Sequence, residues 1–175
     1  LGNRVKAYMD AGDLVPDPII VEVMAKAIAE VPVDKGLLLD GFPRTVAQAE
    51  TLDAQLGELS CPLQAVLVID TPDELLVERI TGRRSCPQCG AVYHVKYMPP
   101  ANDNVCDKDG TELVQRTDDT ESVVRERLAA YRRQTAPVID YYKAADRQEV
   151  VYIDGSGSPD EVTALAVAAL EAAAG

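Results

Sequence analysis

Three short apolar runs constrain the fold of this 175-residue chain most strongly. They lie at residues 36–40 (GLLLD), 65–70 (AVLVID) and 149–153 (EVVYI). A run that is apolar at successive positions, and too short for a helix, is typical of a strand buried on both faces of a parallel sheet. The three runs therefore predict an α/β fold with a parallel sheet.

Helix-start signals alternate with these runs. Asp17-Pro18 places a proline at the first position of a helix, where its missing N–H costs nothing. Thr45-x-x-Gln48 has the spacing of a capping box, and Thr71–Glu74 and Ser158–Glu161 are further cap sequences. We expect a helix to begin at each of these four places.

Residues 82–119 interrupt the alternation. This stretch contains three cysteines, Pro99-Pro100 and the glycines Gly90 and Gly110, and it has no helical period. We interpret it as a small β-rich insert between two parts of an α/β core, residues 17–81 and 120–175. So short a segment buries little apolar surface, and a bound metal would stabilise it.

Two sequences of the same pattern in the insert predict that metal site. CPQCG at 86–90 and CDKDG at 106–110 both have the form ligand-x-x-ligand-Gly. They supply three thiolates, from Cys86, Cys89 and Cys106, and a carboxylate from Asp109. Tetrahedral zinc accepts this set, and four protein ligands would make the site structural.

The residues leave alternatives open for the fourth ligand. One alternative is His94, the only histidine, although it lies outside both five-residue sequences. The other is Cys61, which is far away along the chain. A thioredoxin-like redox pair is disfavoured, because its C-x-x-C opens a helix after a strand. An insert without metal is the remaining alternative.

Composition excludes some classes of protein. The net charge of −12 argues against nucleic acid as the main partner. No apolar run approaches the ~20 residues that span a bilayer, and no signal peptide is recognisable. Four unevenly spaced cysteines do not form a secreted disulfide framework, so we expect a cytoplasmic protein without a membrane partner.

The segment LLLDGFPRT at 37–45 is the most specific motif of the core. It combines an expected strand, an Asp, a tight turn, an Arg and a helix cap. Ligands of α/β sheets bind at the carboxyl ends of strands, which places Asp40 and Arg44 on the functional edge. The planar guanidinium of an arginine can bind phosphate through two hydrogen bonds, although a surface arginine in an ordinary loop is the simpler interpretation.

Several further motifs occur in a fixed order along the chain. They are MDAGDLVPD at 9–17, LLLDGFPRT at 37–45, ERITGRR at 78–84, the Cys-Cys-Cys-Asp insert, QRTDD at 115–119, VRERL at 124–128 and DG at 154–155. Together they resemble the adenylate kinase family, of the long bacterial type with a zinc-binding lid. The resemblance covers the chain from end to end.

The resemblance implies a P-loop-kinase-like core, a lid at 82–119 and, in residues 1–16, the remainder of an AMP-binding segment. It implies the reaction ATP + AMP = 2 ADP with Mg²⁺, a structural Zn²⁺ and a monomer when complete. Arg44, Arg83, Arg116 and Arg127 would then be catalytic.

The resemblance also assigns the remaining site residues. AMP would be bound by Asp13, Leu14, Val15, Gly41, Phe42, Pro43, Arg44, Gln48, Arg116 and Arg127. ATP would be bound by Arg79, Arg83, Val92, Tyr93 and Gly157. Asp40 would orient magnesium through water, and Asp118 and Asp119 would be hinge residues of the lid.

One family feature is missing from this sequence. The phosphate loop G-x-x-x-x-G-K and the strand before it do not occur. We therefore expect this chain alone to be incomplete, with the segment supplied by residues N-terminal to Leu1 or by another chain. The alternative functions are a catalytically inactive nucleotide-binding fragment, a UMP/CMP kinase and a zinc-ribbon interaction protein.

Overall fold

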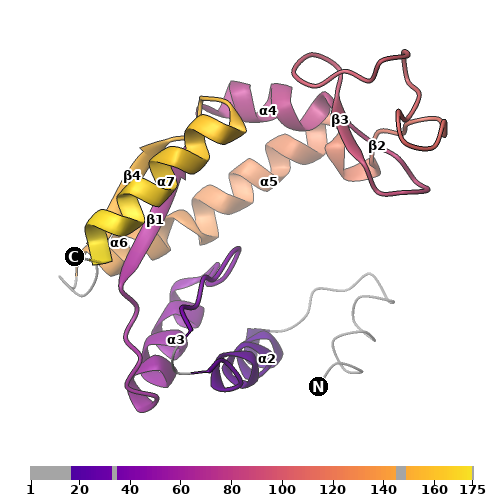
Figure 1. Cartoon of the computed structure of the whole chain (residues 1–175). Coiled ribbons are helices and arrows are strands. Elements are labelled where there is room, and N and C mark those ends of the chain that lie inside the picture. Colours follow the sequence, from indigo (N-terminus) through magenta and orange to yellow (C-terminus); the bar gives the residue numbers. More distant parts are fainter. Residues whose placement is uncertain (1–16, 33–34, 145–148, 175) are drawn as a thin grey trace. The chain divides into compact units, whose positions relative to one another are not determined.

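The computed structural model describes residues 17–32, 35–144 and 149–174 (Figure 1). Its elements are α2 (Asp17–Ala29), α3 (Val46–Glu58), β1 (Ala65–Asp70), α4 (Asp73–Thr81), β2 (Arg83–Ser85), β3 (Val92–His94), η1 (Thr117–Asp119), α5 (Glu121–Gln134), α6 (Ala136–Ala144), β4 (Glu149–Asp154) and α7 (Pro159–Ala174). Strands β1 and β4 are neighbours in one sheet, and β2 and β3 form a second. The predicted α/β class with parallel strands is confirmed.

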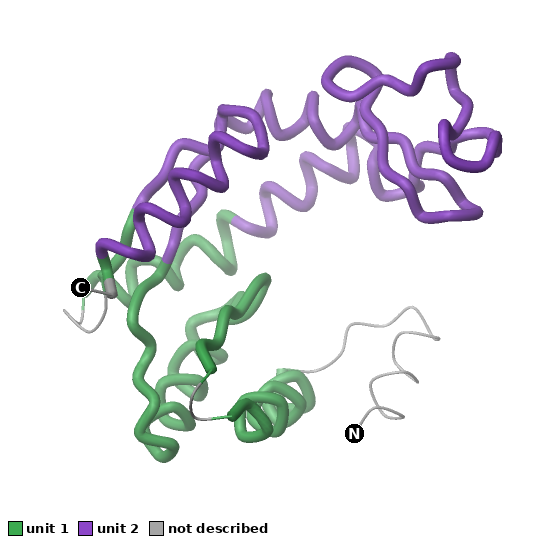
Figure 2. Tube along the Cα trace, viewed as in Figure 1, with its two compact units in different colours: residues 1–66, 132–151, 173–175 green, residues 67–131, 152–172 purple. Residues whose placement is uncertain are grey.

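The chain divides into two compact units (Figure 2). The first comprises residues 1–66, 132–151 and 173–175, and the second comprises residues 67–131 and 152–172. The insert at 82–119 lies wholly within the second unit. This division differs from the predicted domains, which stay a prediction, and each unit is described by itself.

Helix α3 organises the core of the first unit. Ile28 of α2 packs with Leu52 and Leu56 of α3, and Ala49 of α3 packs with Val138 and Tyr142 of α6. Apolar side chains at positions 49, 52 and 56 recur at helical spacing, which is why one helix serves both neighbours.

Two of the four predicted helix starts have the expected side-chain cap, and a third, that of α2, is confirmed in position, with Pro18 as its second residue. Helix α2 begins at Asp17. The Thr45 hydroxyl accepts from the Gln48 amide at the start of α3. At α7 the Ser158 hydroxyl accepts from the Glu161 amide, and the Glu161 carboxylate accepts from the Ser158 amide at 2.7 Å, a reciprocal capping box.

The cap expected from Thr71 is wrong in detail. Helix α4 does begin at Asp73, but its N-cap residue is Pro72, and no side chain caps it. The acidic Asp73 and Glu74 in its first turn still complement the positive end of the helix dipole.

The strand predicted at 36–40 is also wrong. This segment has no regular secondary structure, and the Leu38 side chain is 79% exposed. An apolar run becomes a buried strand only where other strands supply hydrogen-bond partners on its edges. Within the described residues no strand pairs with it. Only Leu39 reaches an apolar cluster, the one formed by α2 and α3.

The insert is β-rich, as predicted. Strands β2 and β3 pair antiparallel, with Arg83 opposite His94 and Ser85 opposite Val92. Isolated bridges continue the pairing, among them Ser85 with Val114. Its buried centre consists of Cys86, Tyr93, Cys106 and Leu113, with Ala91 packed against them. The core of the insert is thus built largely around sulfur.

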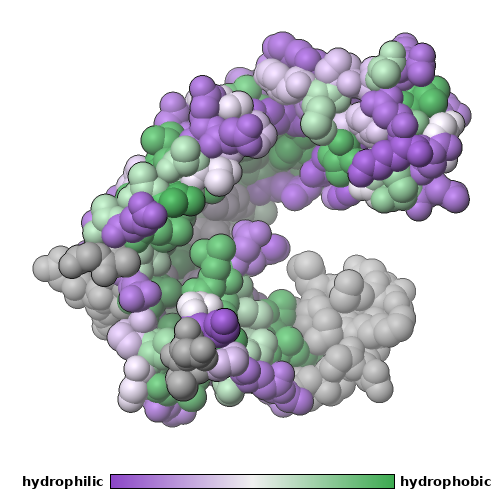
Figure 3. All heavy atoms as spheres, in the orientation of Figure 1, coloured by the Kyte–Doolittle hydropathy of each residue, from purple (hydrophilic) through white to green (hydrophobic). Residues whose placement is uncertain are grey.

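Polar and apolar residues are mixed over the face of the molecule drawn in Figure 3. Among the described residues, no helix has both the length and the apolar character needed to cross a bilayer.

Candidate metal and nucleotide sites

The structure brings together the four side chains that were predicted to bind a metal. One donor atom from each of Cys86, Cys89, Cys106 and Asp109 lies within 4.8 Å of all the others. The Cys86 sulfur is 3.3 Å from one Asp109 oxygen, and the Cys89 and Cys106 sulfurs are 3.6 Å apart. Cys86 and Cys106 are buried, whereas Cys89 and Asp109 are exposed.

Two matching turns hold these donors, and we call them the first knuckle (residues 86–91) and the second knuckle (residues 106–111). In the first, the Gly90 amide donates to the Cys86 carbonyl and the Cys86 amide to Ala91. In the second, Gly110 and Thr111 make the same two bonds with Cys106. The glycines have φ of 72° and 73°, which side chains rarely adopt.

Electrostatics in this cluster favour a cation. The Thr111 amide and then the Cys89 thiol hold the pKa of the Asp109 carboxyl well below its usual range, so Asp109 is anionic. Although the Ala91 backbone lowers it, the Asp109 carboxylate, burial and the other sulfurs raise the pKa of Cys89 to about 12. Four potential anions this close need either retained protons or a bound cation. Three thiolates and a carboxylate are a donor set that zinc accepts.

His94 is engaged elsewhere. Its Nδ1 accepts from the Lys96 and Tyr97 amides at 3.0 and 3.1 Å, so Nε2 carries the proton and donates to the Glu78 carbonyl at 3.3 Å. The ring ties the insert to the end of α4. The other rival ligand, Cys61, is an exposed residue outside the insert.

The turn before α3 organises the predicted AMP residues of the first unit. Gly41 has φ of 72°, and its carbonyl accepts from Arg44 Nε at 2.7 Å. The Arg44 amide donates to the Gln48 side-chain oxygen at 2.7 Å. Phe42 and Pro43 are half-buried between them, and Asp40 is exposed at the start of the turn.

Gln48 is buried and makes a contact that the sequence did not indicate. Its side-chain amide donates to Asp17 at 2.7 Å. Asp17 was assigned only to a helix start, so its link between α2 and α3 was missed. The Asp-Pro helix start gives no signal for a partner this far along the chain.

Arg79 has three backbone partners in the second unit. Its guanidinium donates to the carbonyls of Gly155, Ser156 and Gly157 at 2.6, 2.6 and 2.8 Å. Gly155 lies against the end of β1, because its amide donates to the Asp70 carbonyl at 2.7 Å. Arg79 thus fixes the loop that includes Gly157, another predicted ATP residue.

The predicted catalytic arginines of this unit differ in their partners. Arg83 forms a bidentate pair with Asp119, whose side chain is fully buried, and this pair holds the pKa of the Asp119 carboxyl below its usual range. Arg116 is exposed and donates through Nε to the Ser85 hydroxyl at 3.1 Å. Arg127 is exposed at 3.5 Å from Asp118.

The remaining predicted residues are placed as follows. Val92 is exposed on β3, whereas Tyr93 is buried in the core of the insert. Asp13, Leu14 and Val15 lie outside the described residues. Arg44 and Gln48 belong to the first unit, and the other arginines of the candidate site belong to the second. The nucleotide assignments all stay predictions.

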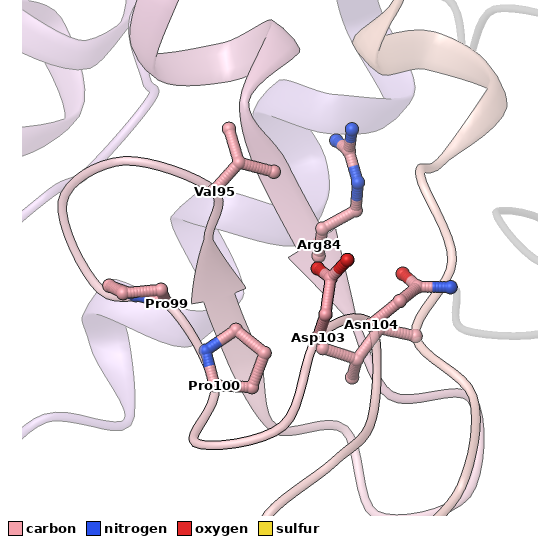
Figure 4. Close-up of a pocket in the computed structure, with 7 residues that line it drawn as sticks. Arg84, Val95, Pro99, Pro100, Asp103 and Asn104 are labelled. Atoms are coloured by element: carbon pink, nitrogen blue, oxygen red, sulfur yellow. The ribbon is translucent and has the colours of Figure 1, made fainter.

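A small pocket of about 180 Å³ lies on the insert and is lined by Arg84, Val95, Pro99, Pro100, Asp103, Asn104 and Leu113 (Figure 4). None of these is a predicted site residue. The Arg84 side chain donates to the Thr81 and Arg83 carbonyls, so it is held by the backbone at the start of the insert.

Comparisons with known proteins identify relatives. A model of the family described as "Adenylate kinase" matches residues 1–147. The chain is 48% identical over 160 residues to an adenylate kinase of Archaeoglobus fulgidus, covering 91% of this chain and 72% of the relative. It is 48% identical over 162 residues to that of Clostridium tetani, covering 93% and 74%. It is 49% identical over 171 residues to that of Carboxydothermus hydrogenoformans, covering 98% and 79%.

Proposed function

The chain belongs to the adenylate kinase family, which makes it a phosphotransferase, and we propose that it acts on ATP and AMP by magnesium-dependent transfer of the γ-phosphoryl group, with an arginine clamp and a closing lid. The ordered set of arginines carries this proposal. Phosphoryl transfer requires the two oxygens in line and positive charge around the transferred group, with little covalent help from the protein.

Arg44 is proposed as the phosphate ligand of AMP. Its Nε donates to the Gly41 carbonyl, and this bond fixes the position of the guanidinium at the turn. Within the described residues no other bond of this guanidinium is found, and the residue is exposed. The terminal nitrogens are therefore available for a bidentate contact with phosphate. Asp40, at the same turn, is proposed to orient magnesium through water.

Arg83, Arg116 and Arg127 are proposed to bind the phosphates of ATP and the transferred group. Asp119 holds one edge of Arg83 and fixes its direction. Arg116 and Arg127 are exposed and have exposed or hydroxyl partners, which they can exchange for phosphate oxygens at low cost. Arg79 and Gly157 are proposed to shape the loop against the ATP base.

The insert at 82–119 is proposed as the lid, residues 17–81 and 120–175 as the core, and residues 1–16 as part of the AMP-binding segment. Cys86, Cys89, Cys106 and Asp109 would hold one zinc ion, which when bound would cross-link the two knuckles and so stabilise the lid. A closed lid excludes water, which would otherwise compete with AMP for the phosphoryl group.

Kinetics of the complete protein that the gene encodes test the proposal. ADP formation from ATP and Mg²⁺ should be fast with AMP and slow with UMP or CMP. Arg44→Ala should raise KM for AMP by about 10- to 100-fold, because a hydrogen bond to a charged group contributes roughly 1.5–3 kcal/mol. KM for ATP should stay unchanged. Arg133→Ala, an exposed arginine without a proposed role, is the matched control.

Turnover with UMP that equals turnover with AMP would contradict the proposed preference for AMP. An unchanged KM for AMP in Arg44→Ala would remove that arginine from the site. Nucleotide binding without any ADP formation by the complete wild-type protein would favour an inactive binding module.

A further inference from the structure

Tyr93 differs from the other residues assigned to ATP, because its side chain points into the protein. It is 8% exposed and belongs to the buried cluster with Cys86, Cys106 and Leu113. Its neighbour Val92, on the opposite face of β3, is exposed. Alternation along a strand therefore leaves Val92 accessible to a ligand and directs Tyr93 toward the candidate metal site.

The direction of the hydrogen bonds at the Tyr93 hydroxyl can be derived. The Asp107 backbone amide can only donate, and it lies 2.9 Å from the Tyr93 oxygen. The hydroxyl accepts this bond with a lone pair and keeps its single proton for another partner. The Cys106 sulfur lies 3.5 Å from the same oxygen. In a metal-free thiol either atom could donate, but a metal-bound Cys106 thiolate would have no proton, and the bond would then run from the tyrosine O–H to the sulfur.

Both partners of the hydroxyl belong to the second knuckle. Cys106 provides its first donor, and Asp107 is the next residue along the chain. A single Tyr93 oxygen therefore fixes the start of this knuckle against β3. Groups that hydrogen-bond to metal ligands orient those ligands and tune their basicity, and their loss typically lowers metal affinity by 10- to 100-fold.

We propose that Tyr93 is a positioning residue of the metal cluster, whose hydroxyl donates to the Cys106 thiolate and docks the second knuckle on β3. The inference rests on the proposed metal site and changes the role of Tyr93 from a nucleotide contact to a metal contact. It also gives β3 a mechanical role. Tyr93 joins β3 to the cluster, and the adjacent His94 joins it to the Glu78 carbonyl of α4.

Tyr93→Phe tests the proposal, because it removes only the hydroxyl and keeps the ring in the core. Tyr97→Phe is the matched control: Tyr97 is an exposed tyrosine of the same insert whose hydroxyl donates to Glu78 at 2.9 Å, away from the cluster. Each variant of the complete protein is loaded with Co²⁺ for absorption spectra. Each is then titrated with Zn²⁺ against a chromophoric chelator. Circular dichroism checks that both remain folded.

In Tyr93→Phe the thiolate-to-cobalt charge-transfer band should move to lower energy, because a sulfur without its hydrogen bond is a better electron donor. Zinc affinity should fall about 10-fold or more. KM for ATP is measured on the same variants, because a nucleotide role of Tyr93 would raise it without changing metal binding. Tyr97→Phe should change neither the band nor the affinity.

Three outcomes would overturn the inference. An unshifted band with unchanged zinc affinity in Tyr93→Phe would remove the hydroxyl from the cluster. A raised KM for ATP with unchanged metal binding would return Tyr93 to the nucleotide site. A wild-type protein that binds neither Co²⁺ nor Zn²⁺ would remove the metal site itself, although the kinase assay could still succeed.

Discussion

The insert at 82–119 folds as its sequence predicts, whereas in the segment at 36–44 the predicted turn forms and the predicted strand does not. In the insert, the backbone bonds of Cys86 with Ala91, Cys106 with Thr111 and His94 with Met98 all join residues close in sequence. In the segment 36–44, the leucines have no strand partner among the described residues, and Leu38 is 79% exposed, while only Leu39 reaches an apolar cluster.

The difference shows where the structural information for each motif resides. A knuckle needs a glycine at positive φ and two backbone bonds, all within six residues. A buried strand needs neighbours that come from elsewhere in the chain, and closing such contacts has an entropic cost. The predictions that follow test whether the insert depends on its local bonds and cluster while the segment at 36–44 tolerates change.

Cys106→Ser should have the largest effect, because it removes a proposed metal ligand and a buried part of the insert core. Structural zinc contributes apparent free energies of about 10–16 kcal/mol to small domains. We expect metal content to fall from about one ion per chain to near zero, with rapid amide exchange across the insert and unchanged protection of α3. Elemental analysis and hydrogen-exchange mass spectrometry measure both effects.

Cys61→Ser is the control, since Cys61 is an exposed cysteine outside the insert. It should leave metal content and exchange unchanged. A metal-free wild type with the same protection in the insert would contradict the prediction.

Asp119→Asn should have the second-largest effect, a loss of folding stability. Its carboxylate is fully buried and pairs with Arg83, whose side chain is 30% exposed. Breaking a buried pair costs about 3–5 kcal/mol, and partial exposure of Arg83 lowers this to about 2–3 kcal/mol. Urea unfolding measures the loss. Asp118→Asn, in the exposed pair with Arg127, should cost less than about 1 kcal/mol. Equal losses in the two variants would show that burial of this pair is unimportant.

The same pair predicts a pH dependence. The Arg83 hydrogen bonds hold the pKa of the folded-state Asp119 carboxyl below its unfolded value of about 4. The stabilisation is therefore complete above about pH 5 and is lost as pH falls through the lower, folded-state pKa. The difference in Tm between wild type and Asp119→Asn should shrink below about pH 4. A difference that persists undiminished in acid would argue against an ionised pair.

Gly82→Ala should have a smaller effect, and it can be compared directly with Gly36→Ala. A Cβ at Gly82 would collide with the His94 ring, whereas a Cβ at Gly36 would meet nothing within 4 Å. Overpacking costs about 1–3 kcal/mol, so Gly82→Ala should lower Tm by several degrees. Gly36→Ala should be neutral or slightly stabilising. A Gly36→Ala variant as unstable as Gly82→Ala would mean that the segment is more tightly packed than the structure shows.

Local chemistry was predictable from the sequence, and long-range partners were not. The Thr45 and Ser158 caps and both knuckles depend on residues within a few positions of each other, so spacing predicts them. The hydrogen bonds from Arg79 to the carbonyls of residues 155–157 join positions that are separated in sequence by the insert and two α-helices. No local pattern indicates that an arginine will bind those carbonyls.

Tyr93 shows a second limit. Spacing placed it in the insert, and the family resemblance placed it at ATP, but neither indicates which face of a three-residue strand is buried. Burial of Tyr93 rather than Val92 is decided by where the sulfur core lies. Asp17 is a similar case, because its contact with Gln48 depends on how α2 packs on α3.

The split exposure of the cluster has a kinetic consequence. Each knuckle contributes one buried donor and one donor that faces solvent, Cys89 from the first and Asp109 from the second. If these four residues hold a zinc ion, an incoming chelator would replace the two outer donors in turn, while Cys86 and Cys106 would still hold the ion. Metal exchange on this protein would then proceed stepwise from the surface, at a rate set by the chelator and not by the rate at which the domain unfolds.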